Sequence, residues 1–223
     1  MDLAAAQAVF GDRYPAAEQY VARLAGPGVT RGLIGPREAD RLWERHMLNS
    51  AVLGELVPDG TAILDVGSGA GLPGIPLALA RPDLSVALLE PMARRVDWLQ
   101  EVVAELELPI RVHRGRVEDS GMRAKLGEWD VVTARAVAPL GRLAGWCLPL
   151  VALGGRLLAV KGATAGEEVA RDMRAVQAAG GGGVEIVQCG AAFVRPPTTV
   201  VVVVQRRAKR ATRNTGVRRR EDW

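Results

Sequence analysis

The stretch Thr61–Pro76 reads T-A-I-L-D-V-G-S-G-A-G-L-P-G-I-P, and the rest of the chain is organised around it. Its apolar start, interrupted only by Asp65, leads into glycines at 67, 69 and 71, which predicts a buried strand that ends in a tight turn. Glycine suits such a turn because a backbone without a Cβ adopts positive φ and closely approaches a bound molecule. Pro73 and Pro76 fit the first turn of a following helix, whose unpaired N–H groups point toward the turn. We therefore interpret this stretch as a cofactor-binding loop.

The identity of the cofactor depends on how the glycines are spaced. Gly69-x-Gly71-x-x-Gly74 matches the dinucleotide fingerprint, but there the first glycine directly follows the strand, whereas Gly67 and Ser68 intervene here. The order from Asp65 through Gly71 instead resembles the first motif of the S-adenosylmethionine-dependent methyltransferases. A glycine-rich turn that binds no ligand is a third interpretation, and it leaves the coincidence of these features unexplained.

The length of 223 residues suits one domain with modest extensions and a full hydrophobic core. The sequence has no run of about eighteen apolar residues and no basic segment followed by an apolar one, so we predict neither a membrane span nor a signal peptide. Cys147 and Cys189 lack the spacing of metal ligands, which is typical of a reducing compartment. We expect a cytoplasmic protein that is a monomer and binds no metal.

Positive charge is concentrated near the carboxyl end of the chain. Eight of the 29 lysines and arginines lie between Arg206 and Arg220, and the body that precedes them is slightly acidic. A basic arm of this kind binds nucleic acid through phosphate contacts, or it remains a solvated, disordered end that favours solubility. Under the first interpretation, the candidate RNA-binding residues are Arg206, Arg207, Lys209 and Arg210.

From residue 61 onward, apolar strand-like runs alternate with helical stretches, which predicts an α/β fold with a mostly parallel sheet covered on both faces. We expect strands at 61–66, 84–90, 110–114, 129–134, 153–160, 184–189 and 199–205, and helices at 73–81, 92–107, 139–149 and 166–179. The connection over 190–197 is too short for a helical crossover, so the last two strands should pair antiparallel, as in methyltransferase sheets. Residues 1–60 are expected to form a helical extension, 61–205 the main domain and 206–223 a disordered tail.

Charged residues follow several of these strands, at the edge where parallel sheets bind ligands. Glu90 ends the second strand, where a carboxylate accepts both ribose hydroxyls of an adenosine, and Glu118 follows the third, where it can grip the adenine. Arg135 follows the fourth strand and either faces the ligand crevice or forms a salt bridge with Glu90 or Asp65. Lys161 ends the fifth strand and either contacts RNA phosphate or remains solvated.

Neither histidine belongs to a known catalytic pattern. His113 lies within a strand and is expected to be packed, whereas His46 lies in the helical extension beside Arg45, Asn49 and Ser50 and is our candidate for an RNA contact. The sequence shows no Ser/His/Asp or Cys/His arrangement and no pair of carboxylates spaced for hydrolysis.

Six motifs follow one another in the order W-E-R-H-M-L-N-S (43–50), L-D-V-G-S-G-A-G-L-P-G-I-P (64–76), R-R-V (94–96), R-V-E (116–118), A-R-A (134–136) and V-K-G (160–162). Together they resemble the ribosomal RNA small subunit methyltransferase G family, also called glucose-inhibited division protein B. The resemblance covers about residues 35–205, and the composition is typical of an actinobacterial member. It implies a class I, Rossmann-like methyltransferase with a seven-stranded sheet, which transfers a methyl group from S-adenosylmethionine to N7 of a guanine in 16S rRNA of the small ribosomal subunit.

The resemblance also implies roles for particular residues. The cofactor should contact Gly67, Ser68, Gly69, Leu72, Val117, Glu118 and Arg135, with Glu90 at the ribose, where aspartate is equally expected. Guanine N7 carries a lone pair and no proton, so the reaction needs no base, and we expect Arg135 to position the reactants. The alternatives are a methyltransferase acting on another RNA or a small molecule, a nicotinamide oxidoreductase and a non-enzymatic RNA-binding protein.

Overall fold

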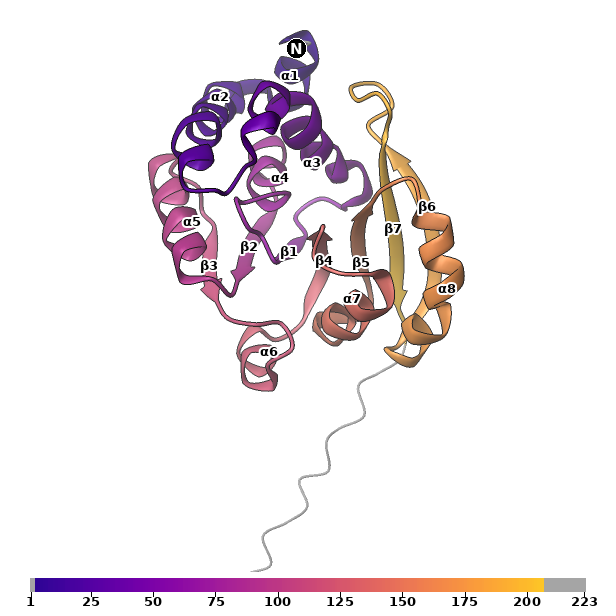
Figure 1. The fold of residues 1–223 in the computed structure, drawn as a ribbon. Coiled ribbons are helices and arrows are strands. Elements are labelled where there is room, and N and C mark those ends of the chain that lie inside the picture. The colour runs from indigo at the N-terminus through magenta and orange to yellow at the C-terminus, as the bar shows by residue number, and fades with distance from the viewer. Residues whose placement is uncertain (1–2, 207–223) are drawn as a thin grey trace, which may run out of the picture.

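A computed structural model describes residues 3–206 and contains one seven-stranded sheet with helices on both faces (Figure 1). The strands are β1 (Ala62–Val66), β2 (Ser85–Glu90), β3 (Arg111–Arg114), β4 (Trp129–Arg135), β5 (Val151–Lys161), β6 (Gly181–Cys189) and β7 (Thr198–Gln205). Their order is β3-β2-β1-β4-β5-β7-β6, and β7 pairs antiparallel with both of its neighbours, while the pairs from β3 to β5 are parallel. The predicted methyltransferase sheet with its antiparallel end is confirmed.

Helices α1 to α3 precede β1, helices α4 to α8 connect the strands from β1 to β6, and 3₁₀ or π turns extend several of them. The α-helices are α1 (Leu3–Phe10), α2 (Tyr14–Arg23), α3 (Asn49–Ala51), α4 (Gly74–Ala80), α5 (Ala93–Glu105), α6 (Ser120–Leu126), α7 (Leu140–Cys147) and α8 (Ala165–Ala178). The 3₁₀ and π segments are η1 (Gly11–Arg13), η2 (Leu24–Gly28), η3 (Pro36–Arg41), η4 (Trp43–Leu48), η5 (Val52–Leu56) and η6 (Leu148–Leu150). Between Pro36 and Leu56 the expected helical extension is a succession of 3₁₀, π and α turns.

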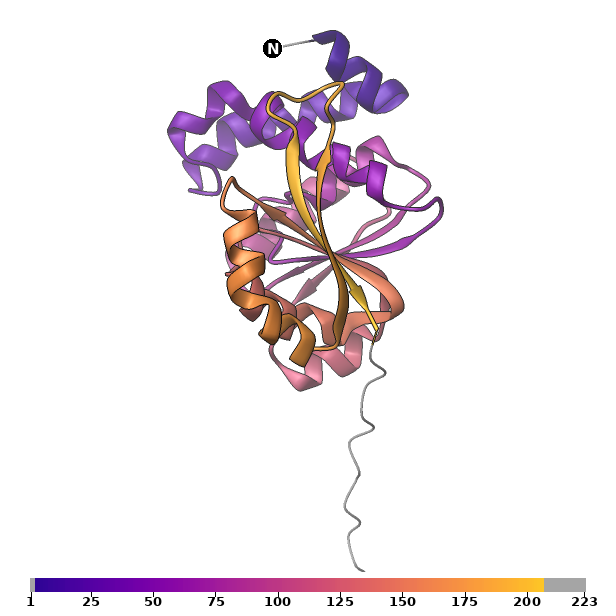
Figure 2. The same cartoon turned by 90° about the vertical axis from the view of Figure 1, so that its right-hand side faces the viewer.

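Alternation along the strands divides the core into two layers. Ile63, Val131 and Leu158 face the amino-terminal helices, α4 and α5, whereas Leu64 and Val132 pack with α7 and α8 on the other face. Figure 2 shows the amino-terminal helices above the sheet and the layer of α7 and α8 below it. Because both faces are covered, the central strands are mostly apolar, which is why they were recognisable in the sequence.

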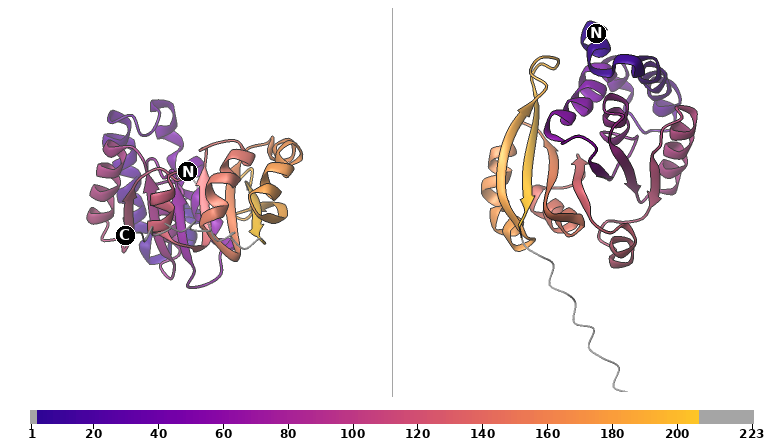
Figure 3. Two further views of the ribbon diagram at one scale, coloured as in Figure 1. Left: turned by 90° about the horizontal axis from the view of Figure 1, so that it is seen from below. Right: turned by 180° about the vertical axis from the view of Figure 1, so that it is seen from behind.

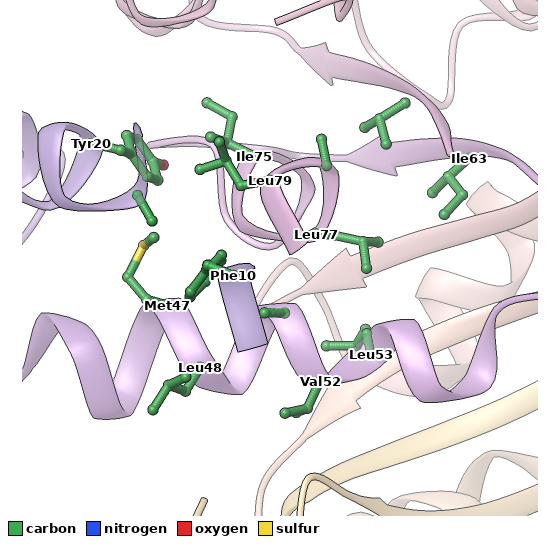
Figure 4. Close-up of a cluster of buried hydrophobic side chains, with 14 of the residues drawn as sticks. Phe10, Tyr20, Met47, Leu48, Val52, Leu53, Ile63, Ile75, Leu77 and Leu79 are labelled. Atoms are coloured by element: carbon green, nitrogen blue, oxygen red, sulfur yellow. The ribbon is translucent and has the colours of Figure 1, made fainter. Parts of the chain in front are cut away.

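The amino-terminal helices pack directly on α4. Phe10, Tyr20 and Met47 lie near Ile75 in one buried cluster (Figure 4). Seen from behind, these helices, α4 and α5 lie together on one side of the molecule, and β6 and β7 lie on the other (Figure 3). Arg81, directly after α4, joins this helix to the amino-terminal extension, since its Nη1 donates to the carbonyl oxygens of Gly54 and Val57 at 2.9 and 3.1 Å.

Helix α6 was not predicted from the sequence, because it has no buried residue and therefore shows no apolar periodicity. Among residues 3–206, no helix combines the length and apolar character that crossing a membrane requires.

Arg206, the last described residue, is exposed, and its N–H donates to the Gly180 carbonyl at 3.0 Å. The expected disorder of the tail and the RNA contacts of Arg207, Lys209 and Arg210 concern positions outside the described residues.

Candidate active site

The loop between β1 and α4 takes its shape from glycines and backbone hydrogen bonds. Gly67, Gly69 and Gly71 have φ angles of +72°, +58° and +111°, which residues with side chains rarely adopt. The N–H groups of Gly67 and Ser68 donate to the Leu89 carbonyl at 2.8 and 3.3 Å, and the Gly71 N–H donates to the Ser68 carbonyl at 2.7 Å. The protein's own contacts therefore fix the loop conformation.

Asp65 lies beneath this loop, fully buried in β1. Its carboxylate accepts hydrogen bonds from the Gly74 N–H and the Thr133 hydroxyl, each at 3.2 Å, and its carbonyl accepts one from the Ser68 hydroxyl at 3.0 Å. Burial raises the pKa of Asp65 to about 6, although its hydrogen bonds oppose the rise. A Cβ on Gly74 would lie 2.9 Å from Oδ2 of Asp65, so the start of α4 sits directly against this carboxylate.

Glu90, the predicted ribose ligand, supports the loop from β2. Its Oε2 accepts a hydrogen bond from the Gly69 N–H and its Oε1 accepts one from the Met92 N–H, both at 3.0 Å. Only 2% of the side chain is exposed, and Nη1 of Arg95 lies 3.9 Å from Oε2. Each carboxylate oxygen keeps a lone pair for a further donor, so Glu90 can hold the loop and still accept a hydroxyl group.

A pocket of about 200 Å³ opens beside Gly67, where β1, β2 and β3 end. Its lining consists of Val66, Gly67, Leu89, Pro91, Gly115, Arg116, Val117, Glu118, Val137 and Trp146. Three predicted cofactor residues, Gly67, Val117 and Glu118, thus line one pocket. Leu72 continues the loop, half-buried, with its N–H donating to the Ser68 carbonyl at 3.0 Å.

Two pocket residues, Val137 and Trp146, were missed by the sequence analysis. Val137 follows β4 and lies close to Gly67. A Cβ on Gly67 would lie only 2.8 Å from Cγ2 of Val137. Trp146 belongs to α7, and the guanidinium of Arg142 lies 5.9 Å from the centre of its ring. Neither residue carries a local signal, because the folding of β4 and α7 against β1 brings them to the pocket.

Arg135 ends β4 and reaches across to the amino-terminal extension. Its guanidinium donates to the Arg45 carbonyl at 2.9 Å, to Nδ1 of His46 at 3.0 Å and to the Ser50 hydroxyl at 3.2 Å. Neither Glu90 nor Asp65 forms an ion pair with Arg135, so the alternative salt bridge considered for it is absent from this part of the structure. Burial lowers the pKa of Arg135, and the nearby Arg45 lowers it further.

His46 connects Arg135 to Glu38. A guanidinium only donates hydrogen bonds, so Nδ1 of His46 accepts, and the neutral ring carries its proton on Nε2. This Nε2 lies 3.0 Å from Oε2 of Glu38. Burial and the charge of Arg135 lower the pKa of His46, which favours this neutral form. The predicted RNA contact, His46, therefore uses both ring nitrogens within the protein.

Lys161 ends β5 and fixes the segment that follows Arg135. Its Nζ lies 2.8 Å from Oε2 of Glu168 and donates to the Ala138 carbonyl at 2.9 Å, with 9% of the side chain exposed. The same Glu168 oxygen accepts the Leu140 N–H at 3.0 Å, at the start of α7, where a negative charge is favourable. Within this segment, Ala136 has a φ of +55°, an uncommon value for alanine.

The pocket and loop fit the nucleoside part of S-adenosylmethionine. Val66, Leu89 and Val117 give the pocket apolar walls that suit a purine, and Glu118 supplies a carboxylate that accepts from an amino group. At Gly69 a Cβ would meet only the Gly67 carbonyl, at 3.8 Å, so the backbone is open to close approach there.

A family model described as GidB, rRNA small subunit methyltransferase G, matches residues 13–196. The chain belongs to this family. Ribosomal RNA small subunit methyltransferase G of Rhodococcus jostii (strain RHA1) is 55% identical over 191 residues, which cover 86% of this chain and 84% of that protein. The predicted family, with an actinobacterial relative, and the predicted class of enzyme, an rRNA methyltransferase that uses S-adenosylmethionine, are confirmed.

Solved structures support the fold. The S-adenosylmethionine-dependent methyltransferase SibL has a TM-score of 0.58 and 21% identity, over 77% of this chain and 58% of its own. Fibrillarin of Aeropyrum pernix, solved with natively bound S-adenosylmethionine, has a TM-score of 0.52 and 18% identity, over 72% of this chain and 74% of its own. At these identities the likeness shows the fold alone, which is the architecture of class I methyltransferases.

Proposed function

We propose that this chain methylates N7 of a guanine in 16S rRNA and that the loop over Gly67–Gly71, with the pocket beside it, binds the nucleoside of S-adenosylmethionine. The enzyme transfers the methyl group to RNA of the small ribosomal subunit, the activity that its family membership supports. The loop is the observation that carries the assignment of the site, because the protein's own hydrogen bonds fix its conformation and Gly69 leaves it open to close approach.

When bound, S-adenosylmethionine supplies a methyl group on a positively charged sulfur. The protein's contribution is to orient donor and acceptor and to exclude water, which in well-aligned pairs lowers a barrier by roughly 7–11 kcal/mol. Arg135 suits this positioning role, since three acceptors on the extension hold its guanidinium at the end of β4. Guanine N7 needs no base, and Arg135 acts as the residue that orients the substrate and the cofactor.

Glu90 and Glu118 bind the two ends of the adenosine in this assignment. Glu118 lies on the pocket wall with 43% of its side chain exposed, which leaves the carboxylate available to the adenine amino group. Glu90 accepts the ribose hydroxyls on the lone pairs that its hydrogen bonds to Gly69 and Met92 leave free. Ser68 and Leu72 support the loop through their own hydrogen bonds.

Residues on three elements contribute to RNA binding in this proposal. His46 acts by holding Arg135 toward the substrate, and Lys161 by a phosphate contact that competes with its ion pair to Glu168. Arg206 begins the basic tail and directly follows Gln205, the last residue of β7. Because β7 runs antiparallel to β5, its carboxyl end lies at the edge of the sheet opposite the pocket. The enzyme acts as a monomer in the cytoplasm, where small subunits are assembled, and light scattering of the purified protein tests the monomer.

The decisive experiment uses purified protein, labelled S-adenosylmethionine and small subunits from cells that lack the enzyme. We expect one labelled position in 16S rRNA, which chemical mapping identifies as N7-methylguanine, and no labelling of subunits that already carry the modification. Arg135→Ala should bind the cofactor and lose most of the rate. Labelling of another base, or of RNA already modified, would exclude the proposed function, and full activity of Arg135→Ala would exclude the positioning role alone.

A further inference from the structure

Two hydrogen bonds from different parts of the molecule end on one carbonyl of the cofactor loop. The hydroxyl of Tyr20, in α2, donates to the Ala70 carbonyl at 2.8 Å, and Nε1 of Trp98, in α5, donates to the same oxygen at 2.9 Å. Both side chains are fully buried. A carbonyl oxygen has two lone pairs, so these two donors saturate it.

The peptide unit between Ala70 and Gly71 is thereby held at both ends. Its carbonyl is bound by Tyr20 and Trp98, and its N–H donates to the Ser68 carbonyl at 2.7 Å. Rotation of this unit would break all three hydrogen bonds and leave buried polar groups unpaired, which is costly. Neither donor lines the pocket, so any influence on the cofactor passes through the loop.

Tyr20 also limits what can stand at position 71. A Cβ on Gly71 would lie 2.7 Å from the Tyr20 hydroxyl oxygen, and the φ of +111° already disfavours a side chain. The phenol therefore occupies the space that glycine leaves, and the loop and the amino-terminal extension fit together at this point.

The surroundings of Trp98 tie the extension to α5. The guanidinium groups of Arg23 and Arg31 lie 5.2 and 5.6 Å from the ring centre of Trp98. Both arginines also pair with Glu101, at 3.2 and 2.8 Å, and Arg23 pairs with Glu105 at 3.1 Å. These partly exposed ion pairs are individually weak, but they close the extension over the indole from the solvent side.

We propose that Tyr20 and Trp98 are positioning residues for S-adenosylmethionine, which hold the Ala70–Gly71 peptide in its binding conformation from the side away from the pocket. The amino-terminal extension, through Tyr20, then helps to hold the cofactor loop in its binding conformation. This inference rests on the proposed cofactor site, and it concerns binding of the cofactor only, so affinity for the demethylated product S-adenosylhomocysteine tests it without RNA.

The test compares Tyr20→Phe, Trp98→Phe and the double variant by calorimetry with S-adenosylhomocysteine, at a temperature where circular dichroism shows each to be folded. Each single variant leaves one donor, so we expect the dissociation constant to rise about threefold. The double variant leaves the carbonyl unpaired, and we expect a rise of about fiftyfold, more than the product of the single effects. The KM for S-adenosylmethionine should rise in parallel, while the KM for the small subunit stays unchanged.

Tyr14→Phe is the matched control. It lies on the same helix, but its hydroxyl donates to Glu18 at an exposed position, so its removal should leave cofactor affinity unchanged. If the Tyr20 and Trp98 variants melt at lower temperature yet bind like the unaltered chain, their role is structural and the proposal is wrong. If the double variant does not fold, Tyr20→Phe alone decides, because unchanged affinity in it also overturns the proposal. Failure of the unaltered chain to bind would instead refute the proposed site.

Discussion

Nη2 of Arg135 lies 3.0 Å from Nδ1 of His46, so the residue expected to orient the reactants is held by a histidine more than eighty residues earlier in the chain. Glu38 binds the other nitrogen of the ring at 3.0 Å and also pairs with Arg45 at 3.0 Å. A carboxylate, an imidazole and a guanidinium thus form one continuous series from the extension to the end of β4.

This series predicts a loss of activity in acid. The lowered pKa of His46 keeps the ring neutral near pH 7. As the pH falls through that lowered value, Nδ1 becomes protonated, can no longer accept from Arg135, and faces the charges of Arg135 and Arg45, which Glu38 only partly offsets. We expect kcat/KM to fall with this protonation. The same shift makes the folded state lose stability between pH 6.5, the ordinary value, and the lowered pKa.

Two substitutions separate the hydrogen bond from other causes of an acid limb. His46→Asn presents an amide oxygen near the position of Nδ1 and does not titrate, so it should keep most of the activity and lose the acid limb. His46→Ala should lower kcat/KM about tenfold or more near pH 7, as expected for a lost hydrogen bond to a charged group. An unaltered acid limb in His46→Asn would show that another group titrates.

Asp65→Asn should stabilise the protein increasingly as the pH rises. The folded chain binds a proton at Asp65 with a pKa of about 6, compared with 3.8 for an exposed aspartate. Above about pH 4 the unfolded chain therefore loses this proton more readily than the folded chain, and the free energy of unfolding falls as the pH rises. The relative gain of the variant between about pH 4 and pH 7 should be roughly 3 kcal/mol, at 1.36 kcal/mol per pH unit. Urea unfolding at both pH values measures it, and an equal difference at the two values would contradict the prediction.

Glycine-to-alanine changes in the loop should differ in cost. In Gly69→Ala the added Cβ would meet only the Gly67 carbonyl, at 3.8 Å. We therefore expect the free energy of unfolding to fall by about 1–2 kcal/mol, the cost of the left-handed backbone alone. Gly71→Ala would bring a Cβ against Cδ1 of Ile75 and to 2.7 Å from Oη of Tyr20, which should add about 1–3 kcal/mol. Denaturant titration of both variants checks the order, which equal losses would refute.

Trp146→Ala should weaken cofactor binding. Its ring lines the pocket, and removal of an aromatic side chain that stacks on a base costs about 1–3 kcal/mol. Trp146→Phe retains an aromatic surface and serves as the matched control, with most of the affinity kept. Calorimetry with S-adenosylhomocysteine measures both, and an Ala variant that binds as tightly as the Phe variant would remove Trp146 from the site.

Lys161→Gln distinguishes a phosphate contact from an internal support. Loss of a phosphate contact lowers the slope of log affinity against log salt by about 0.7–0.9. Loss of the ion pair with Glu168 and of the bond to Ala138 should instead lower the melting temperature and leave the slope unchanged. Glu168→Gln removes only the internal partner, so a change of slope in Lys161→Gln but not in Glu168→Gln supports the contact with RNA.

The sheet and the cofactor loop were predictable because their causes are local. Strands buried on both faces are apolar runs, as in Val200–Val203, and positive φ at Gly67 and Gly69 requires residues that the sequence displays. The supports of the loop were not predictable in this way. Tyr20 lies 50 residues from Ala70, and nothing near either residue indicates that they meet. Helix α6 was missed for the opposite reason, because a solvent-facing helix leaves no apolar pattern.

The junction between the extension and the end of the chain has a consequence for biosynthesis. The Thr198 hydroxyl donates to the side-chain oxygen of Asn49 at 2.6 Å, across a separation of 149 residues, and the Gly190 N–H donates to Glu55 across 135. At roughly 5–20 residues per second, a ribosome takes about 7–30 s to synthesise the missing partner. Helix α3 and the turn η5 that follows it therefore lack these partners for that interval of translation.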